Sequence, residues 1–417
     1  MLLAYYDEKR VSDRSIKKTT RRLDGVREEV ANSLLEQDKS NPLYALSVMY
    51  DDAYIEECRK VAEEIGRVKH LVVVGIGGSS AGIQAIYDVL RTESSPTLSV
   101  LSDINVDAFK TLCRTLDKYK SVDDVSVCVI SKSGTTTETL VNAEMLLEYL
   151  VQKFGEEVYK RFVFISTAQS DLLTKGRRLG AHLATLPESV SGRFSILTSV
   201  GQIPMHLLEL PMDTLMDGAR SAGEEDYDKL ASTSAARLYR YYRLGYIEQN
   251  VFIFSDRLLS LGRWYQQLFC ETLGKTVRLN GRKVNPIFNL TISTARELHS
   301  TAQLYFSGRG RVFFDFYSLV DTNESFLPTK TRLDEKYSGH SLEEIESVIY
   351  AGVQQAMKTM MLPFSTTTIE EDRAYSLGLF LSIKMREAIY LAHLMDVDAF
   401  NQPNVEIYKK HVREILF

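Results

Sequence analysis

Two short turns rich in glycine and hydroxyl side chains are the first features of this sequence that could do chemistry. The earlier one, Gly75–Gly82 (GIGGSSAG), stands between an apolar run, His70–Val74, and a helical pattern that begins near Ala81. Glycines let the backbone turn sharply, and the N-terminus of a helix presents unpaired N–H groups to an anion. Gly78 and Ser79 are therefore candidate ligands for a phosphate group.

This first turn is open to three interpretations. A dinucleotide fold would show GxGxxG with an acidic residue about 20 positions further on to hold a ribose, and Asp103 is suitably placed for that role. The observed spacing is GxGGSxxG, and its serines suit a compact phosphate better than a pyrophosphate. A phosphosugar site is therefore favoured, while a dinucleotide site and a purely structural turn stay open.

The second turn, Ser131–Glu138 (SKSGTTTE), follows an apolar run that ends at Ile130, and it also opens a helix. A phosphate monoester carries about two negative charges at neutral pH, and short charge-assisted hydrogen bonds hold it firmly. One such run alone would be an ordinary N-cap region, but two on alternate strands of one sheet indicate a site for a phosphorylated ligand. The candidate ligands here are Ser131, Lys132, Ser133, Thr135 and Thr136.

Alternating strand and helix patterns position both turns. Strands are predicted at His70–Val74, Leu98–Leu101, Val125–Ile130 and Phe162–Ser166, with helices between them. This alternation implies right-handed crossovers and a parallel sheet covered on both faces, with ligands at the carboxyl ends of its strands.

A second set of elements follows a helical bridge at residues 201–244. Strands are predicted at Val251–Phe254, Val284–Leu290 and Val312–Tyr317, and helices at Gly262–Leu273, Leu342–Met361 and Tyr375–Met395. The predicted fold class is α/β, with two lobes whose mainly parallel sheets are flanked by helices, plus helical N- and C-terminal segments. The length of 417 residues agrees, because single cores stop growing near roughly 250–300 residues.

Composition excludes several classes of function. The net charge of −5 is spread along the chain and gives no basic stripe for nucleic acid and no polybasic membrane anchor. The sequence has no apolar run of about 18 residues and no apolar core of a signal peptide, so we expect a cytoplasmic protein. The four cysteines are scattered, and no His, Asp or Glu cluster has the spacing of metal ligands. We expect neither a metal nor a cofactor.

Six segments are similar, in the same order, to those of the phosphoglucose isomerase family, whose members carry sugar-isomerase domains. They are VVVGIGGSSAG (72–82), SKSGTTTET (131–139), SGRFSILTSVG (191–201), WYQQLFCETLGK (264–275), ELHSTAQLY (297–305) and AFNQPNVEIYKK (399–410). The resemblance covers essentially the whole chain and looks like the compact bacterial or archaeal branch. It implies metal-independent, reversible isomerisation of glucose 6-phosphate to fructose 6-phosphate through a cis-enediol, in glycolysis and gluconeogenesis.

The resemblance also implies how the chain is divided. We expect flavodoxin-like lobes of the sugar-isomerase type, the first (51–205) binding phosphate and the second (206–395) carrying the catalytic base. An N-terminal helical segment (1–50) would pack on the second lobe, and a C-terminal segment (396–417) would return to the active site.

Roles at the reacting carbons follow from the same resemblance. Glu271 matches the base that takes a proton from C2 and returns it to C1. Arg193 matches the arginine that stabilises negative charge on the enediolate oxygens. Gln267, four residues before Glu271 and thus on the same helix face, matches a sugar-binding glutamine.

Ring opening is assigned in the same way. His299 matches the ring-opening histidine, Lys409 a lysine that assists at the ring oxygen, and Gln402 a further binding glutamine. In the family the histidine comes from the neighbouring subunit, so the resemblance implies a homodimer with His299 shared across the interface.

Three residues depart from the family pattern, namely Ala81, Ser191 and Thr272, and none of them removes a reacting group. Two other functions compete with the isomerase. A non-catalytic phosphosugar sensor could lose Glu271, His299 or Lys409, yet all three are present. A nicotinamide-dependent oxidoreductase leaves the second turn unexplained. The sequence leaves open whether mannose 6-phosphate is also a substrate.

Overall fold

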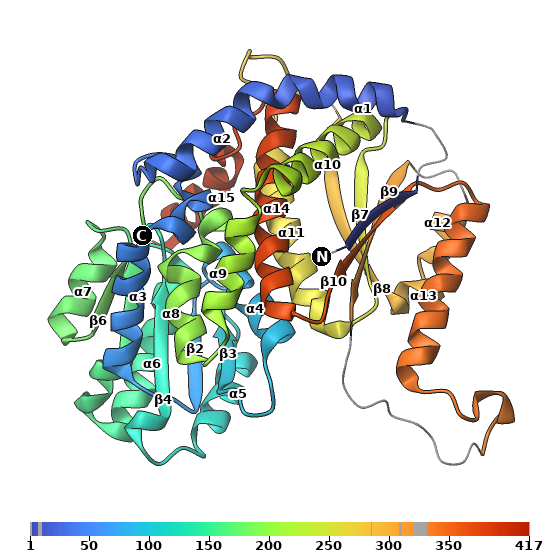
Figure 1. The fold of residues 1–417 in the computed structure, drawn as a ribbon. Helices are drawn as coiled ribbons and strands as arrows, with labels where there is room; N and C mark the ends of the chain where they lie inside the picture. Colours follow the sequence, from blue (N-terminus) through green and yellow to red (C-terminus); the bar gives the residue numbers. More distant parts are fainter. Residues whose placement is uncertain (1, 7–10, 285, 308–310, 321–331, 417) are drawn as a thin grey trace.

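The fold is known from a computed structural model, which describes residues 2–6, 11–284, 286–307, 311–320 and 332–416. Two five-stranded sheets stand side by side, with helices covering both (Figure 1). The predicted α/β class with two mainly parallel sheets is therefore confirmed.

The first sheet contains β2 (His70–Val74), β3 (Thr97–Leu101), β4 (Val125–Ile130), β5 (Phe162–Ser166) and β6 (His182–Thr185). All neighbours are parallel and the strand order is β3-β2-β4-β5-β6. This is the flavodoxin-like order, in which the crevice beside the first strand marks the expected ligand site. That crevice is where β2 and β4 end, and the two predicted turns leave from there.

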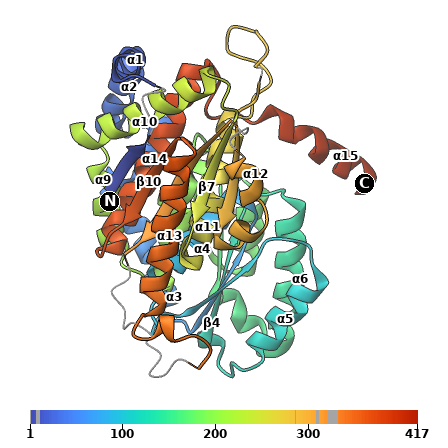
Figure 2. The ribbon, with the colours of Figure 1, turned by 90° about the vertical axis from the view of Figure 1, so that its right-hand side faces the viewer.

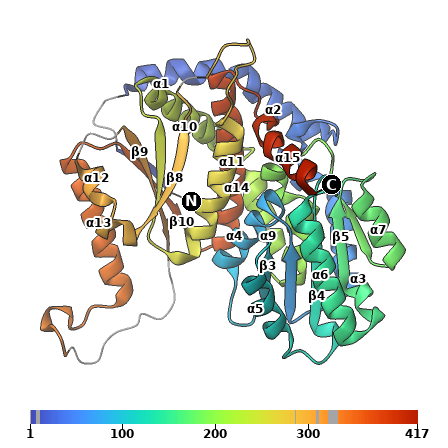
Figure 3. The same cartoon turned by 180° about the vertical axis from the view of Figure 1, so that it is seen from behind.

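Four helices connect these strands, namely α4 (Ala81–Leu90), α5 (Val106–Leu116), α6 (Thr137–Phe154) and α7 (Asp171–Leu179). Strands β2, β4 and β5 are buried along their whole length because helices cover both faces of this sheet. Figure 3 shows the sheet from behind, with α5, α6 and α7 around it.

The second sheet contains β7 (Glu248–Ile253), β8 (Asn289–Thr294), β9 (Val312–Leu319), β10 (Phe364–Ile369) and β1 (Leu2–Tyr6). Its order is β1-β10-β9-β7-β8, and only β1 pairs antiparallel. The four parallel strands repeat the order of the first sheet, with β7 in the place of β2. Helix α11 (Leu259–Leu273) therefore follows β7 as α4 follows β2, and the two helices pack against each other.

The remaining helices join and flank the lobes. They are α1 (Asp13–Thr20), α2 (Asp24–Glu36), α3 (Asp52–Ile65), α8 (Ser199–Leu207), α9 (Met212–Ser221), α10 (Glu225–Arg243), α12 (Ala302–Phe306), α13 (Leu342–Thr359), α14 (Arg373–Met395) and α15 (Glu406–Leu416). Helix α14 runs through the middle of the molecule and packs against α9, α10 and α11 (Figure 1). Figure 2 shows α15 leaving the body of the molecule.

Some predicted elements were wrong or missing. The strand expected at 284–290 begins only at Asn289, because Pro286 has no N–H to give to a sheet; residue 285 lies outside the described residues. The N-terminal segment is not helical throughout, since Leu2–Tyr6 forms the edge strand β1. Strand β10 has the polar sequence FSTTTI, which gave no apolar signal, and β6 is short.

Candidate active site

The two glycine-containing segments of the first lobe meet closely. At Gly77 the backbone has a φ of +61°, a conformation that glycine adopts at little cost. A Cβ atom at Gly78 would lie 2.1 Å from the backbone oxygen of Gly192, so only glycine fits there. The hydroxyl of Ser195 lies 2.7 Å from the Gly192 oxygen and 3.5 Å from that of Gly78. The first turn is thus fastened to η7 (Gly192–Leu197), which carries Arg193.

The second turn is folded on its own hydroxyl groups. Ser131 Oγ and Thr136 Oγ1 are 2.9 Å apart, and the N–H of Gly134 donates to Ser131 Oγ at 3.2 Å. The N–H and the hydroxyl of Thr135 both donate to Ser133 Oγ. Ser131 is buried whereas Ser133 and Thr135 are exposed. The sequence places these hydroxyls at the start of α6, where free N–H groups favour an anion.

Lys132 supplies the positive charge of this turn. Its side chain is half-buried, and burial lowers the pKa of its ammonium. Glu188 raises that pKa in opposition, and Arg193 lowers it further. The influence of Arg193 links the second turn electrostatically to the residues on η7.

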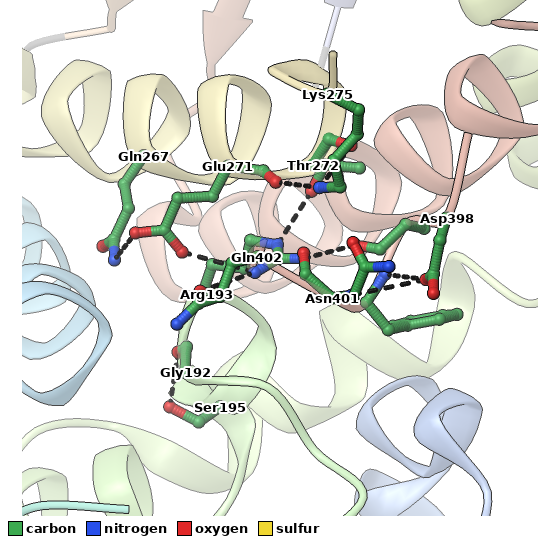
Figure 4. Close-up of polar contacts among 12 residues, drawn as sticks. Gly192, Arg193, Ser195, Gln267, Glu271, Thr272, Lys275, Asp398, Asn401 and Gln402 are labelled. Carbon is green, nitrogen blue, oxygen red and sulfur yellow. Dashed lines mark hydrogen bonds and ion pairs between the residues drawn. The ribbon is translucent and has the colours of Figure 1, made fainter. Parts of the chain in front are cut away.

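Arg193 is the centre of the site (Figure 4). Its side chain is completely buried, and all five N–H donors of its guanidinium have acceptors. Nε donates to Thr272 Oγ1 at 3.0 Å, and Nη1 donates to Glu271 Oε2 at 3.3 Å and to Gln402 Oε1 at 3.1 Å. Nη2 donates to the backbone oxygens of Ala399 and Asn401. Burial lowers the pKa of Arg193, and Glu271 opposes that effect.

Glu271 lies in the last turn of α11 and is 29% exposed. Its Oε1 accepts from Gln267 Nε2 at 3.0 Å, one helical turn earlier, while Oε2 faces Arg193. The carboxylate is thus held from two sides yet stays accessible to a ligand. A Cβ at Gly77 would come within 2.9 Å of Gln267 Nε2, so the glycine turn lies directly against this pair.

The structure brings together four predicted residues, Arg193, Gln267, Glu271 and Gln402, from three separate segments of the chain. Lys409 lies half-buried on α15, a few residues beyond Gln402. His299 is exposed at the end of η9 (Ala295–His299), next to β8. Within the described part of the chain, no hydrogen bond or ion pair joins His299 to Arg193 or Glu271.

Sequence reasoning missed several contributors. The hydroxyl of Thr272 accepts from Arg193, although the sequence suggested only a departure from the family pattern. Ser195 and Lys275 were not singled out, even though both stand inside the matching segments. The backbone oxygens of Ala399 and Asn401 have no sequence signal at all, because any residue could supply them.

This arrangement suits proton transfer next to developing negative charge. An accessible carboxylate can act as a base, and a fixed, fully bonded guanidinium can stabilise an oxyanion beside it. No group of three His, Cys, Asp or Glu side chains that could hold a metal ion occurs in the described part of the chain. No helix described here is long and apolar enough to cross a membrane.

Comparisons with known proteins point to one family. The model of the family described as phosphoglucose isomerase matches residues 54–416. A glucose-6-phosphate isomerase from Pediococcus pentosaceus is 28% identical over 390 residues, covering 88% of this chain and 85% of that protein. A probable glucose-6-phosphate isomerase from Methanococcus maripaludis is 29% identical, covering 93% of this chain and 87% of its own length.

Solved structures show the same fold. A hypothetical protein from Thermus thermophilus superimposes with a TM-score of 0.85 at 24% identity, covering 100% of both chains. A glucose-6-phosphate isomerase from Chlamydia trachomatis gives a TM-score of 0.79 at 20% identity, covering 99% of this chain and 88% of that one.

Proposed function

The chain belongs to the phosphoglucose isomerase family, and from this premise we propose that it interconverts glucose 6-phosphate and fructose 6-phosphate. The observation that supports this most directly is the accessible carboxylate of Glu271, held between Gln267 and Arg193. Both predicted phosphate-binding turns belong to the first lobe; the first lies beside this pair, since Gly77 lies against Gln267, and Arg193 influences Lys132 of the second.

Phosphate binding comes first in the proposed mechanism. The hydroxyls of Ser79, Ser131, Ser133, Thr135 and Thr136, the Lys132 ammonium and the backbone at Gly78 would hold the phosphate monoester. Hydrogen bonds from charged donors are about twice as strong as neutral ones, so Lys132 contributes most among the side chains. This anchors one end of the sugar and leaves C1 and C2 free to reach the second lobe.

Ring opening precedes proton transfer in this proposal. His299 of a neighbouring subunit would move a proton at the ring oxygen, with Lys409 assisting. His299 is exposed in the single chain, which leaves its side chain available to another subunit. The proposed assembly is a homodimer with two equivalent composite sites.

Proton transfer then passes through Glu271. Its carboxylate takes the proton from C2 of the open aldose, forming a cis-enediolate, and returns it to C1 to give the ketose. Negative charge on the enediolate oxygens is stabilised by Arg193, whose fixed position removes the need for reorganisation during the step. Gln267 and Gln402 would bind the sugar, and their contacts with Glu271 and Arg193 also orient the carboxylate and the guanidinium.

The test is fructose 6-phosphate formation from glucose 6-phosphate in EDTA by the wild-type protein and by Glu271→Gln. The proposal predicts activity in the wild type and a loss of about 10²–10⁴-fold in kcat for the variant, because only the base is removed. Glu144→Gln, which changes an exposed carboxylate on α6, is the matched control and should keep wild-type activity.

The result separates the isomerase from its alternatives. A folded wild-type protein that binds sugar phosphate without isomerising it would favour a sensor and overturn the proposal. Activity that survives Glu271→Gln would keep the reaction but move the base to another residue. Mannose 6-phosphate formation in the same assay decides whether that sugar is also made.

Subunit mixing tests the shared site. Glu271→Gln and His299→Asn proteins are each inactive in the proposal, yet a heterodimer of the two contains one intact site. Mixing equal amounts under exchange conditions should restore about one quarter of the wild-type activity, since half of the dimers are mixed and each has one working site of two. No recovery in proteins shown to exchange would mean that His299 serves its own chain.

We also propose a cytoplasmic location and the domain boundaries predicted from the sequence (1–50, 51–205, 206–395 and 396–417). All four cysteines are free, as expected in a reducing compartment.

A further inference from the structure

The C-terminal end of α11 is completed by a side chain. The last four carbonyl groups of a helix have no partner within it. In α11 the carbonyl of Cys270 accepts from the N–H of Gly274, and that of Leu273 accepts from the N–H of Lys275. The carbonyls of Glu271 and Thr272 both accept from the Lys275 ammonium, the second at 3.1 Å. Every terminal carbonyl is therefore bonded, two of them by one buried cation.

Lys275 is unusually enclosed for a lysine, with only 4% of its surface exposed. Among the described residues it forms no ion pair with a carboxylate, and its neighbours are carbonyl oxygens at the negative end of a helix, which favours a positive charge there. The charged groups around it are Arg193 on η7, Asp398 after α14 and Glu271 on the preceding helix, α11. Burial, reinforced by Arg193, lowers the pKa of Lys275 to about 8, while Asp398 and Glu271 oppose the shift.

The two residues that this ammonium binds are those that form the site. Glu271 carries the carboxylate, and Thr272 accepts from Arg193 Nε at 3.0 Å. We propose that Lys275 is a positioning residue for the reaction, because its ammonium fixes the last turn of α11 and with it the Glu271 carboxylate and the Thr272–Arg193 contact. This role rests on the proposed isomerase function.

The pH dependence of the rate should report on this role. When pH rises through the pKa of Lys275, the amine loses its charge, and its bonds to the two carbonyls weaken. The last turn of α11 is then less firmly held, so kcat falls on the alkaline side. A residue that served only to stabilise the fold would change the unfolding temperature without moving this limb of the pH–rate profile.

The experiment compares Lys275→Met, Lys275→Arg and the wild type between pH 6 and 10, with kcat, KM and the unfolding temperature measured for each. Lys275→Met removes the donors at similar length and should lower kcat about 10–100-fold at pH 7, because small misplacements of reacting groups carry losses of that size. KM should change little, since the phosphate turns are untouched. Lys283→Met, an exposed lysine that follows in the same loop, is the control and should behave as the wild type.

Lys275→Arg keeps a charge that does not titrate in this range. Its alkaline limb should therefore move to higher pH, with kcat above that of Lys275→Met. A Lys275→Met protein with wild-type kcat and pH profile overturns the inference while leaving the isomerase intact. If Lys275→Met does not fold, an unmoved alkaline limb in Lys275→Arg overturns it equally. An inactive wild type would overturn both this role and the proposed function.

Discussion

The turn after β4 and the end of α11 hold their functional side chains by opposite means. In the turn, the hydroxyl–hydroxyl contacts join residues at most five positions apart, as between Ser131 and Thr136. At the end of α11, Arg193 is separated by 78 positions from Glu271 and by 209 from Gln402. The hydroxyl groups of the turn are therefore arranged by local sequence, although the carbonyls of Ser131 and Lys132 also accept from the hydroxyls of Ser166 and Thr167. The cluster around Arg193, by contrast, forms only when both lobes and the segment after α14 have folded together.

The two sheets show the same difference. Strands β2, β4 and β5 are almost entirely apolar. By contrast, the second sheet buries Asp315 on β9, which accepts from Lys384 of α14 at 3.2 Å and from Ser365 of β10 at 2.7 Å. Lys384 also pairs with Glu387, and Glu387 accepts from the hydroxyl of Tyr265 on α11 at 2.6 Å.

This buried network joins α14, the sheet and the helix that carries Glu271. The first lobe therefore positions turns on an apolar scaffold, while the second positions a helix through charges and hydrogen bonds. A scaffold of the second kind is specific in geometry but sensitive to the loss of any one member, because an unpaired buried charge is costly.

The largest expected effect comes from breaking that network. Lys384→Met removes the ammonium and leaves Asp315 and Glu387 buried without it, which should lower the free energy of unfolding by about 3–5 kcal/mol. Urea unfolding monitored by circular dichroism measures the loss. Lys229→Met, at an exposed position on α10, should change it by no more than about 0.5 kcal/mol. Equal stability of the two variants would mean that the Lys384 ammonium does not stabilise the second sheet, and the contrast with the apolar first sheet would be lost.

Arg193→Met should have the next largest effect, and mainly on the rate. In the proposed mechanism the variant loses the buried positive charge that stabilises the oxyanion, so kcat should fall about 10²–10³-fold, equivalent to about 3–4 kcal/mol. Arg193→Lys keeps the charge without the five-donor fork and should recover only a small part of the rate. Steady-state kinetics measure both. If Arg193→Lys restored full activity, the long-range hydrogen bonds would not be what the centre requires.

In the first sheet, the buried His70 should make the free energy of unfolding depend on pH. His70 in β2 is buried, and burial lowers its pKa to about 4, with Lys118 adding to the shift. Because the folded pKa lies below the unfolded value of about 6.5, the histidine's contribution to stability is complete above pH 6.5 and is lost as pH falls through 4. The difference in unfolding free energy between the wild type and His70→Gln should therefore shrink by about 3 kcal/mol between pH 7 and 4.

His411→Gln is the matched control, since His411 is exposed on α15. At pH 7 it should change the free energy of unfolding by no more than about 0.5 kcal/mol. A difference for His70→Gln that stays level between pH 7 and 4 would mean that this histidine accepts its proton inside the folded sheet.

How far the sequence predicts the molecule follows from the same contrast between local and distant contacts. Both turns, the strands they leave and the helix that carries Glu271 were predicted, because glycine, hydroxyl and apolar patterns act over a few residues. Strand β10 was missed because its polar residues do not resemble a buried strand. The sequence does not show that the hydroxyls of Ser365 and Thr367 donate to the buried Asp315. Edge strand β1 was missed because its pairing with β10 spans almost the whole chain.

The site divides in the same way. Family motifs identified Glu271, Arg193, Gln267 and Gln402, and the structure places them together. Lys275 was not predicted, because its role depends on burial and on the two carbonyls that it meets. The roles of all the predicted site residues stay predictions, and those of His299 and Lys409 depend in addition on a second subunit.

The smallest expected effect tests whether the turn after β4 and the end of α11 act separately in binding and in proton transfer. Lys132→Met removes the charge of the phosphate turn, and a lost hydrogen bond to a charged group is worth about 1.5–3 kcal/mol, or roughly 10–100-fold in KM for glucose 6-phosphate. Stability should change little, because the hydroxyl contacts of the turn remain. Lys175→Met on α7, where the lysine is exposed, is the control.

If binding and proton transfer are separate, kcat of Lys132→Met stays near the wild-type value while KM rises, and inorganic phosphate inhibits more weakly by the same factor. If kcat falls instead, the charge on Lys132 reaches the transition state. Arg193 already lowers the pKa of Lys132, so an electrostatic route between the two regions exists. A fall in kcat together with the rise in KM would then make this route, and not the packing of α4 on α11, the connection through which the phosphate turn influences the proposed catalytic centre.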